Sequence, residues 1–192
     1  MRSRKLPRSF YERPTLEVAK DLLGKYLVHH TAEATLIGKI VETEAYVGPD
    51  DKASHASRGQ TKRTEIMFGP AGYAYVYLIY GMYHCLNVVT EREGFPAAVL
   101  IRALEPITEG DPSTLAGEKL TNGPGKLCRY MKIDNRLNGA DLCGLALYIE
   151  DRGQKVMPEQ IIAAKRVGVE YAGRWKEKPW RFYIKGSPYV SK

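Results

Sequence analysis

The sequence predicts a single domain of the α+β class, in which a few helices flank several β-strands. The chain has 192 residues, enough for one domain with a real hydrophobic core. One short stretch shows the helical spacing of apolar residues, whereas several others place apolar residues at every second position. We therefore expect one domain over residues 1–192, with a basic and flexible segment at 1–9.

The first predicted elements are a short helix and two strands. Thr15 can cap a helix that runs to Leu23, with an apolar stripe on one side and Gly24 just past its end. Residues 25–31 and 36–46 follow as strands, because both alternate and carry β-branched and aromatic side chains. We expect the helix to pack on the core.

The second of these strands carries two carboxylates in one phase. Glu42 and Glu44 alternate in step with Leu36, Ile40 and Tyr46. The alternation leaves open which face of the strand is buried. If the face with the carboxylates is buried, they need partners or a function, because an unpaired buried charge is unfavourable.

Residues 47–72 form a long segment without periodicity, rich in Gly, Pro, Asp, Ser and Arg. A loop of this length in a compact domain is usually either functional or disordered. It carries His55, Arg58, Lys62 and Arg63. We expect an ordered loop that touches phosphate, and a solvated charged loop is the alternative.

The tyrosine-rich segment 73–89 predicts a β-hairpin with its tip at residues 80–82, Tyr-Gly-Met. Hairpin tips are normally polar, because an aromatic side chain there buries nothing. An apolar tip has two explanations. Either another part of the fold covers it, or it is a wedge that enters a DNA minor groove or a membrane interface.

Arg102 interrupts a further strand, 97–104, that is otherwise apolar. We expect it to form an ion pair, either purely structural or one that orients a catalytic carboxylate or water. The remaining segments are a loop with a short helix at 106–123, a helix entry at 122–126, a strand at 144–150, a helical or extended piece at 158–164, a tight loop at 166–169, and a segment at 178–188 that closes the sheet or packs on its rim.

Charge and cysteine usage narrow the possible functions. The net charge of +7 favours a polyanionic partner. The apolar runs are too short to span a bilayer, and no apolar segment follows the basic N-terminus to make a signal peptide. The three cysteines and four histidines form no disulfide or metal-ligand pattern. We expect a cytoplasmic protein without a metal, a cofactor or a membrane partner.

Several motifs, taken in order, resemble the alkyladenine (3-methyladenine) DNA glycosylases of the mammalian type. The match runs from Phe10 almost to the end of the chain with compatible spacing. The motifs are Val41-Glu-Thr-Glu-Ala-Tyr46, His55, Met67-Phe-Gly-Pro, Tyr75-Val-Tyr-Leu-Ile-Tyr-Gly-Met-Tyr-His-Cys-Leu-Asn87, Leu100-Ile-Arg-Ala-Leu-Glu-Pro106, Asn122-Gly-Pro-Gly-Lys-Leu-Cys128, Arg166-Val-Gly-Val169 and Arg181-Phe-Tyr-Ile-Lys-Gly-Ser-Pro188. One departure is Thr64, where these proteins usually carry Asn after the Arg.

The resemblance implies a curved, mainly antiparallel sheet with a protruding hairpin. It also implies a monomeric, monofunctional DNA glycosylase of base excision repair that acts on double-stranded DNA containing damaged purines. Such an enzyme flips alkylated or deaminated purines of the 3-methyladenine, 7-methylguanine, hypoxanthine and ethenoadenine class, hydrolyses the N-glycosidic bond and leaves an abasic site.

The same resemblance implies residue roles. Glu44 would be the general base, and Arg102 would hold Glu44 and the attacking water. The extruded base would be bound by Tyr46, His55, Tyr77, Asn87 and the backbone at Val167, which would also contact the water. DNA intercalation and backbone contacts would come from Tyr80, Met82, Arg58, Arg63 and Lys126.

These residue types suit the chemistry. Aromatic walls favour electron-poor, cationic purines. A carboxylate opposite the leaving base can activate water and offset the charge of an oxocarbenium-like sugar. Glu44 follows from the family pattern and Glu42 is the fallback. A second acid is not obvious, so we expect neutral bases to be poorer substrates. Lys39 lies in the opposite phase from Glu44, which disfavours an amine-dependent lyase route.

Three other functions fit parts of the sequence. A non-catalytic nucleic-acid-binding module would use the tyrosines and the positive charge, and Glu44 would then be dispensable. A glycoside or nucleoside hydrolase would pair Glu42 with Glu44, but it has no use for an exposed Tyr80. A membrane-surface role for the hairpin tip lacks support from a basic amphipathic helix.

Overall fold

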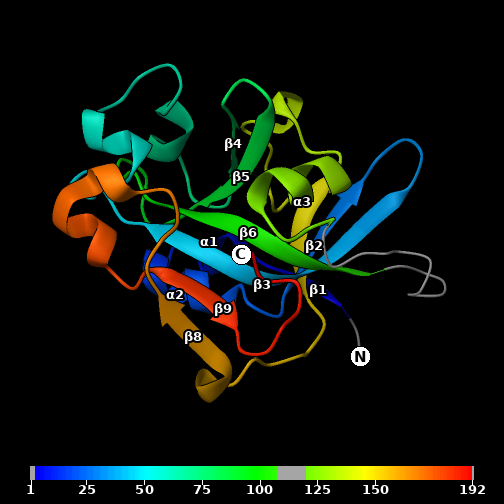
Figure 1. Ribbon diagram of the computed structural model, residues 1–192. Helices are drawn as coiled ribbons and strands as arrows, with labels where there is room; N and C mark the ends of the chain where they lie inside the picture. The colour runs from blue at the N-terminus through cyan, green and yellow to red at the C-terminus, as the bar shows by residue number, and fades with distance from the viewer. Residues whose placement is uncertain (1–2, 108–119, 192) are drawn as a thin grey trace.

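A curled antiparallel sheet forms the centre of the molecule (Figure 1). The computed structural model describes residues 3–107 and 120–191. Within these residues nine strands join in the order β1-β7-β2-β3-β6-β5-β4, and β9 pairs with both β3 and β8. The predicted fold class is confirmed. The strands are β1 (Arg4–Lys5), β2 (Tyr26–His30), β3 (Thr35–Tyr46), β4 (Ala74–Ile79), β5 (Tyr83–Val89), β6 (Ala98–Ile107), β7 (Leu147–Asp151), β8 (Ile161–Ala164) and β9 (Arg181–Ile184).

Strand β3 organises the sheet. It pairs with β6 along most of its length. A strand has two hydrogen-bonding edges, so its other edge is shared: β2 pairs with residues 35–39 and β9 pairs with residues 42–44. The sheet divides at this point into one branch through β2 to β7 and another through β9 to β8.

Both faces of β3 are buried in its second half. Thr43 and Ala45 of one phase are fully buried, and so are Glu42 and Glu44 of the other. The Thr43 hydroxyl donates to the carbonyl of Ala19 at 2.8 Å, so this phase faces the helix that begins at Thr15. The two carboxylates therefore lie on the opposite face, inside the protein.

Short helices flank the sheet. The α-helices are α1 (Arg8–Tyr11), α2 (Thr15–Asp21) and α3 (Pro124–Tyr130), and the 3-10 helices are η1 (His55–Arg58), η2 (Glu65–Phe68), η4 (Asn135–Leu137), η5 (Pro158–Gln160) and η6 (Glu170–Glu177). Helix α2 packs on the core through Val18 and Ala19, and Leu22, directly after the helix, is also fully buried.

The helix predicted from Thr15 is confirmed, with two corrections. It ends at Asp21, and Thr15 is its first residue, because Pro14 holds the capping position. The Thr15 hydroxyl does not cap the helix. It contacts the Thr90 hydroxyl at 3.0 Å and donates to the Glu91 carboxylate, so it fastens the helix to the turn after β5.

The N-terminal segment is part of the fold where the structure describes it. Strand β1 pairs with β7, and Leu6 is buried in the main core. Residues 4–6 therefore have defined contacts, the flexibility expected for 1–9 stays a prediction, and residues 1–2 lie outside the described range. None of the described helices is long and apolar enough to cross a membrane.

The later segments keep the predicted order with shifted boundaries. Strand β6 runs on to Ile107, and most of the loop predicted at 106–123 lies outside the described residues. The helix entry at 122–126 leads into α3, with Pro124 at its first position. The strand expected at 144–150 begins only at Leu147. The piece at 158–164 is a 3-10 turn followed by β8, and β9 closes the sheet against β3.

The predicted hairpin is confirmed as β4 and β5, with its turn at residues 80–82. Tyr80 and Gly81 have φ of +53° and +70°, and the Met82 N–H donates to the Ile79 carbonyl. Positive φ is unfavourable for tyrosine by about 1–2 kcal/mol. The side chain of Tyr80 is nonetheless 84% exposed. The tip is thus not covered by another described part of the fold, and it projects from the sheet in Figure 1.

The long segment 47–72 is ordered. It contains η1 and η2, and several of its side chains are buried, among them Ala53, Ala56 and Met67. Asp51, fully buried, anchors the start of the segment by accepting from the backbone N–H groups of Val47 and Ala53.

Candidate active site

A cavity of about 220 Å³ opens beside the hairpin. The hairpin, the start of β6, the 47–72 segment and the 166–169 loop all contribute to it. All five residues predicted to bind the base line this cavity: Tyr46, His55, Tyr77, Asn87 and Val167. Arg102 and Tyr80 line it too. Glu44 does not line the cavity itself, but its carboxylate contacts three residues that do, namely Tyr46, Arg102 and Val167. The full lining is Tyr46, Ala53, Ser54, His55, Met67, Tyr75, Tyr77, Ile79, Tyr80, Cys85, Asn87, Ala98, Leu100, Arg102, Pro124, Val167, Gly168, Val169 and Tyr171.

One wall of the cavity is an aromatic cluster of His55, Tyr75 and Tyr77. The His55 ring meets Tyr77 edge to face at 4.6 Å between centroids, and Tyr75 lies 5.3 Å from Tyr77. His55 Nδ1 is 3.0 Å from the Tyr75 hydroxyl. The guanidinium of Arg63 covers Tyr77 at 5.1 Å. These contacts hold the rings in place before any ligand enters.

His55 is neutral at physiological pH. Burial, together with the positive charges of Arg63 and Arg58, lowers its pKa to about 4. A neutral imidazole beside the cavity does not repel a cationic ring. The wall therefore accepts positive charge on a ligand more readily than a protonated histidine would.

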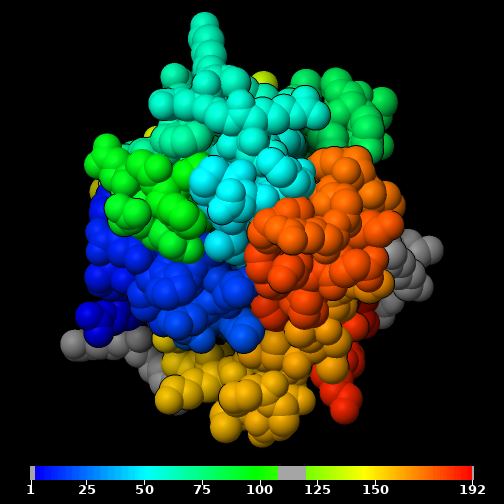
Figure 2. Space-filling view, turned by 90° about the vertical axis from the view of Figure 1, so that its left-hand side faces the viewer, coloured from blue at the N-terminus to red at the C-terminus, as the bar shows by residue number. Residues whose placement is uncertain are grey.

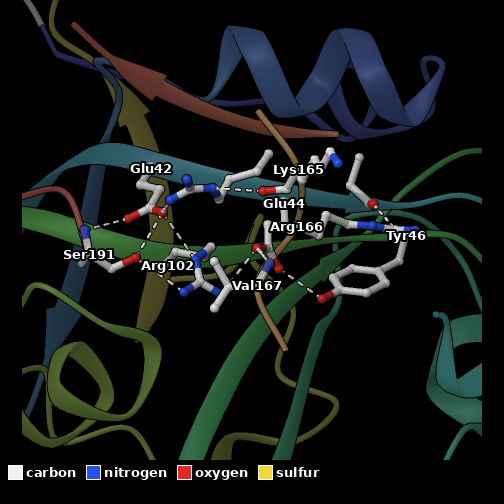
Figure 3. A network of polar contacts seen from close by, with 10 residues as sticks. Glu42, Glu44, Tyr46, Arg102, Lys165, Arg166, Val167 and Ser191 are labelled. Carbon is white, nitrogen blue, oxygen red and sulfur yellow. Dashed lines mark hydrogen bonds and ion pairs between the residues drawn. The ribbon is translucent and has the colours of Figure 1, made fainter. Parts of the chain in front are cut away.

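The carboxylate of Glu44 has a defined set of donors (Figure 3). Its Oε1 accepts from the backbone N–H of Val167 at 2.8 Å and pairs with Arg102 Nη1 at 3.2 Å. Its Oε2 accepts from the Tyr46 hydroxyl at 2.8 Å. A carboxylate oxygen can accept two hydrogen bonds. Among the described residues Oε2 has only this one donor, and the Glu44 side chain is fully buried behind residues that line the cavity.

Burial raises the pKa of Glu44, because the charged form loses its hydration. The positive charge of Arg102 and the hydrogen bonds from Val167 and Tyr46 oppose this effect. The result is a carboxylate that is a stronger base than an exposed glutamate, as proton abstraction from water requires.

Glu42 has a structural set of partners, and these hold Arg102 (Figure 3). Its carboxylate accepts from Arg102 Nε at 3.1 Å, from Arg181 at 2.9 Å, and from the Ser191 backbone N–H at 2.7 Å. Arg102 also donates to the Ser191 hydroxyl at 3.1 Å. The guanidinium is thus clamped on its far side, which leaves Nη1 directed at Glu44.

A second buried ion pair lies under the 166–169 loop. Arg166 and Asp51 are both fully buried and meet through two hydrogen bonds, of 2.5 and 2.9 Å. Arg166 also donates to the carbonyl of Ala45, at 2.9 Å, and stacks on Tyr46. The pair therefore fixes the backbone that offers the Val167 N–H to Glu44.

The residues predicted to contact DNA are exposed, and Tyr80 among them lines the cavity. Tyr80 and Met82 are both strongly exposed on the hairpin tip. Arg58 and Arg63 are exposed on the 47–72 segment. Lys126 is exposed at the start of α3, where its Nζ donates to Asn122 Oδ1 at 2.8 Å.

Two further predictions concern Lys39 and Thr64. Lys39 forms an ion pair with Glu105 and does not line the cavity, so it does not approach Glu44. Thr64 turns its hydroxyl inward to the carbonyl of Gly59 at 3.2 Å and contacts Thr61. The departure from the family pattern at this position thus preserves an ordered loop.

Four contributors to the site had no role predicted from the sequence: Asp51, Arg166, Ser191 and Tyr171. Alternation could not indicate them, because none of them lies in a strand. The available signal for Asp51 was its place in a Gly-Pro-Asp-Asp turn after the acidic strand. Its partner Arg166 is 115 residues away, so no local pattern indicates the pair.

Comparisons with known proteins find relatives over nearly the whole chain. A family model described as Methylpurine-DNA glycosylase (MPG) matches residues 9–188. A protein of Methanocella arvoryzae is 56% identical over 195 residues, which cover 97% of this chain and 96% of the relative. One of Legionella pneumophila (strain Corby) is 56% identical over 189 residues, covering 98% and 99%. One of Alkaliphilus oremlandii is 51% identical over 204 residues, also covering 98% and 99%. All three bear the name "Putative 3-methyladenine DNA glycosylase".

Proposed function

Because the chain belongs to the methylpurine-DNA glycosylase family, and is therefore a hydrolase of N-glycosyl bonds, we propose that it excises damaged purines with a water activated by Glu44. Its substrates are alkylated and deaminated purines of the 3-methyladenine, 7-methylguanine, hypoxanthine and ethenoadenine class in double-stranded DNA. The protein is cytoplasmic and associates with the nucleoid when bound to DNA. It acts as a monomer and leaves an abasic site. The position of Glu44 directly behind an aromatic cavity is the observation that carries the proposal.

The extruded base enters the cavity between Tyr46, Tyr77 and His55. Taking a base out of the stack costs a few kcal/mol, and less at a damaged pair; glycosylases are a standard example of this step. The exposed Tyr80 fills the gap left in the duplex and so slows the return of the base. The aromatic faces favour a cationic purine, and neutral His55 does not oppose it.

The attacking water binds at the free acceptor position of Glu44 Oε2. Glu44 takes a proton from this water, and the water oxygen attacks the anomeric carbon as the base departs. The negative charge of Glu44 also offsets the positive charge that develops on the sugar. Arg102 and the Val167 N–H hold Oε1, so the carboxylate keeps its orientation during the reaction.

The test is a single-turnover assay on a duplex oligonucleotide with one alkylated adenine, followed by alkali. We expect release of the free base and strand breaks only after alkaline treatment, because a water and not an amine attacks the sugar. Strand breaks before alkali would indicate a lyase. Binding of the duplex without base release would indicate a nucleic-acid-binding module in place of an enzyme.

Base release should slow on acidification, because only ionised Glu44 accepts a proton. Burial raises its pKa above the ordinary value, so the rate should fall at a higher pH than an exposed glutamate would give. His55, with a pKa of about 4, stays neutral over this range. In a pH–rate profile, H55Q should lower the rate but keep the midpoint of the wild type. If the fall in rate at low pH disappeared in H55Q, the group whose protonation slows base release would be His55 and not Glu44.

Tyr80→Gly should impair action on duplex DNA without destabilising the protein. The stacking lost with the ring is worth about 1–3 kcal/mol, or roughly fivefold to 150-fold in the population of the flipped state. Glycine also relieves the unfavourable φ of Tyr80. The measurement compares base release from duplex and single strand, together with Tm. An equal rate on duplex DNA would remove Tyr80 from the flipping step.

Asn87→Ser should widen the range of accepted bases. Asn87 is buried in the cavity wall, and its Nδ2 donates to the Tyr75 carbonyl at 3.2 Å, which fixes the amide against the edge of a bound base. A shorter side chain leaves room for a 2-amino group. The rate ratio of a guanine-type to an adenine-type lesion should rise about tenfold. An unchanged ratio would leave Asn87 with a structural role only.

A further inference from the structure

A second hollow, of about 1010 Å³, adjoins the base cavity. We call it the basic groove. It lies between the 47–72 segment and η6, and Figure 2 shows these two segments, cyan to teal and orange, side by side on one face of the molecule. Its lining is Lys52, Ser54, His55, Ser57, Arg58, Thr61, Arg63, Thr64, Tyr171, Ala172, Gly173, Arg174 and Trp175.

The basic groove and the base cavity share a wall. Ser54, His55 and Tyr171 line both. Tyr171 is 68% exposed, and its hydroxyl donates to the carbonyl of Ala53 at 3.2 Å, which holds the ring at the boundary between the two hollows. If one unit of a polymer occupies the cavity, the neighbouring units can therefore continue directly into the groove.

The charge of the groove has one sign. Lys52, Arg58, Arg63 and Arg174 are all exposed. None of them forms an ion pair within the described part of the chain, and none of the residues that line the groove is acidic. Exposed cations left unpaired in a concave surface attract a polyanion.

Aromatic side chains stand among these cations. Tyr171 and Trp175 line the groove, and Arg174 lies 5.7 Å from the Trp175 ring. Positive charge combined with aromatic faces is the arrangement that binds unpaired nucleotides, because phosphates meet the cations and bases stack on the rings.

We propose that the basic groove binds the strand that carries the lesion, on one side of the extruded nucleotide, as a locally unstacked run of nucleotides. This inference rests on the proposed function, because the extruded nucleotide must occupy the neighbouring cavity. Lys52 and Arg174 contact phosphates from opposite walls of the groove. The groove thereby holds the strand in the distorted form that flipping produces, and it adds affinity that is independent of the damaged base.

The test measures how salt weakens DNA binding. The ligand is a duplex with a central abasic-site analogue that the enzyme cannot cleave. The groove variant is Lys52→Gln with Arg174→Gln. The matched control is Lys176→Gln with Lys185→Gln, which removes the same charge from exposed positions outside both hollows. Lys52→Arg with Arg174→Lys keeps the charge and serves as a second control.

We expect the slope of log Kd against log salt to fall by about 0.9 for each lost phosphate contact, or about 1.8 for the groove variant. Between about 50 and about 200 mM salt, the advantage of the wild type over this variant then shrinks about tenfold. The two controls keep the wild-type slope. Equal slopes in the groove variant and the Lys176/Lys185 control would overturn the proposal.

Truncated duplexes identify the strand. In one duplex the lesion strand ends just before the abasic analogue, and in the other it ends just after it. The deficit of the groove variant should vanish with one of these duplexes and persist with the other. Persistence with both would show that the groove binds the undamaged strand. The outcome can be told apart from a failure of the proposed function. If the enzyme releases the base but the groove variant keeps the wild-type salt slope, only the groove proposal is wrong. If the slope changes but the wild type releases no base, only the proposed glycosylase activity is wrong.

Discussion

Glu44→Gln should lower the single-turnover rate of base release by about a hundredfold to ten-thousandfold, the usual contribution of a positioned general base. Glutamine is isosteric but cannot take a proton from water at neutral pH. The cavity lining does not change, since Glu44 lies behind it. Binding of a duplex with an abasic analogue should therefore persist. The measurement is base release at saturating enzyme, with Tm recorded to show that the variant is folded.

The matched control for this experiment is Glu105→Gln. Glu105 lies near the end of β6, forms an ion pair with Lys39 of β3, and is partly exposed. The same change of carboxylate to amide there should leave base release as in the wild type. If Glu44→Gln retained the wild-type rate within a few-fold, Glu44 would not be the base, and the water would have to be activated elsewhere in the cavity.

Asp51→Ala should lower the free energy of unfolding by about 3–5 kcal/mol, because it leaves the buried guanidinium of Arg166 without its counter-charge. This is a large part of the 5–15 kcal/mol that stabilises a typical domain. For a chain of this size it corresponds to a fall in Tm of roughly 10 °C. Denaturant unfolding with a common m-value and a thermal scan would both measure it.

The comparison for this prediction is Asp21→Ala, which breaks the exposed pair of Asp21 with Arg13. That change should cost no more than about 1 kcal/mol, because water screens exposed pairs. The double substitution Asp51→Leu with Arg166→Met should recover part of the loss by removing both charges. A cost for Asp51→Ala no greater than that of Asp21→Ala would mean that water reaches Arg166 and the pair is not truly buried.

Local patterns predicted the elements because backbone geometry produces them. The alternation in 73–89 reports which side chains share a face of β4 and β5, and the structure places Tyr75 and Tyr77 together in the cavity wall. The helix at Thr15 and the start of α3 at Pro124 follow from equally local rules. Boundaries moved by a few residues where pairing with another strand extended an element, as in β6.

The same rules could not decide between Glu42 and Glu44. Both lie in one phase of β3 and both are fully buried, so alternation treats them alike. The structure separates them by their partners. Glu42 is engaged by Arg181 and the Ser191 backbone, which lie away from the cavity, whereas Glu44 is held by the Tyr46 hydroxyl and the Val167 N–H, whose residues line it. Resemblance to a family indicates Glu44 as the base, and this difference in hydrogen-bonding partners supports that proposal.

The sequence by itself determined the fold class, the hairpin with its apolar tip and the acidic strand, because each depends on residues close together in the chain. Tertiary structure decided the electrostatics of the site. The contacts of Glu44 with Val167 and of Glu42 with Ser191 join residues 123 and 149 positions apart. Such contacts exist only after the sheet has curled and taken the carboxylates out of water. Their strength comes from that desolvation, which no local sequence pattern records.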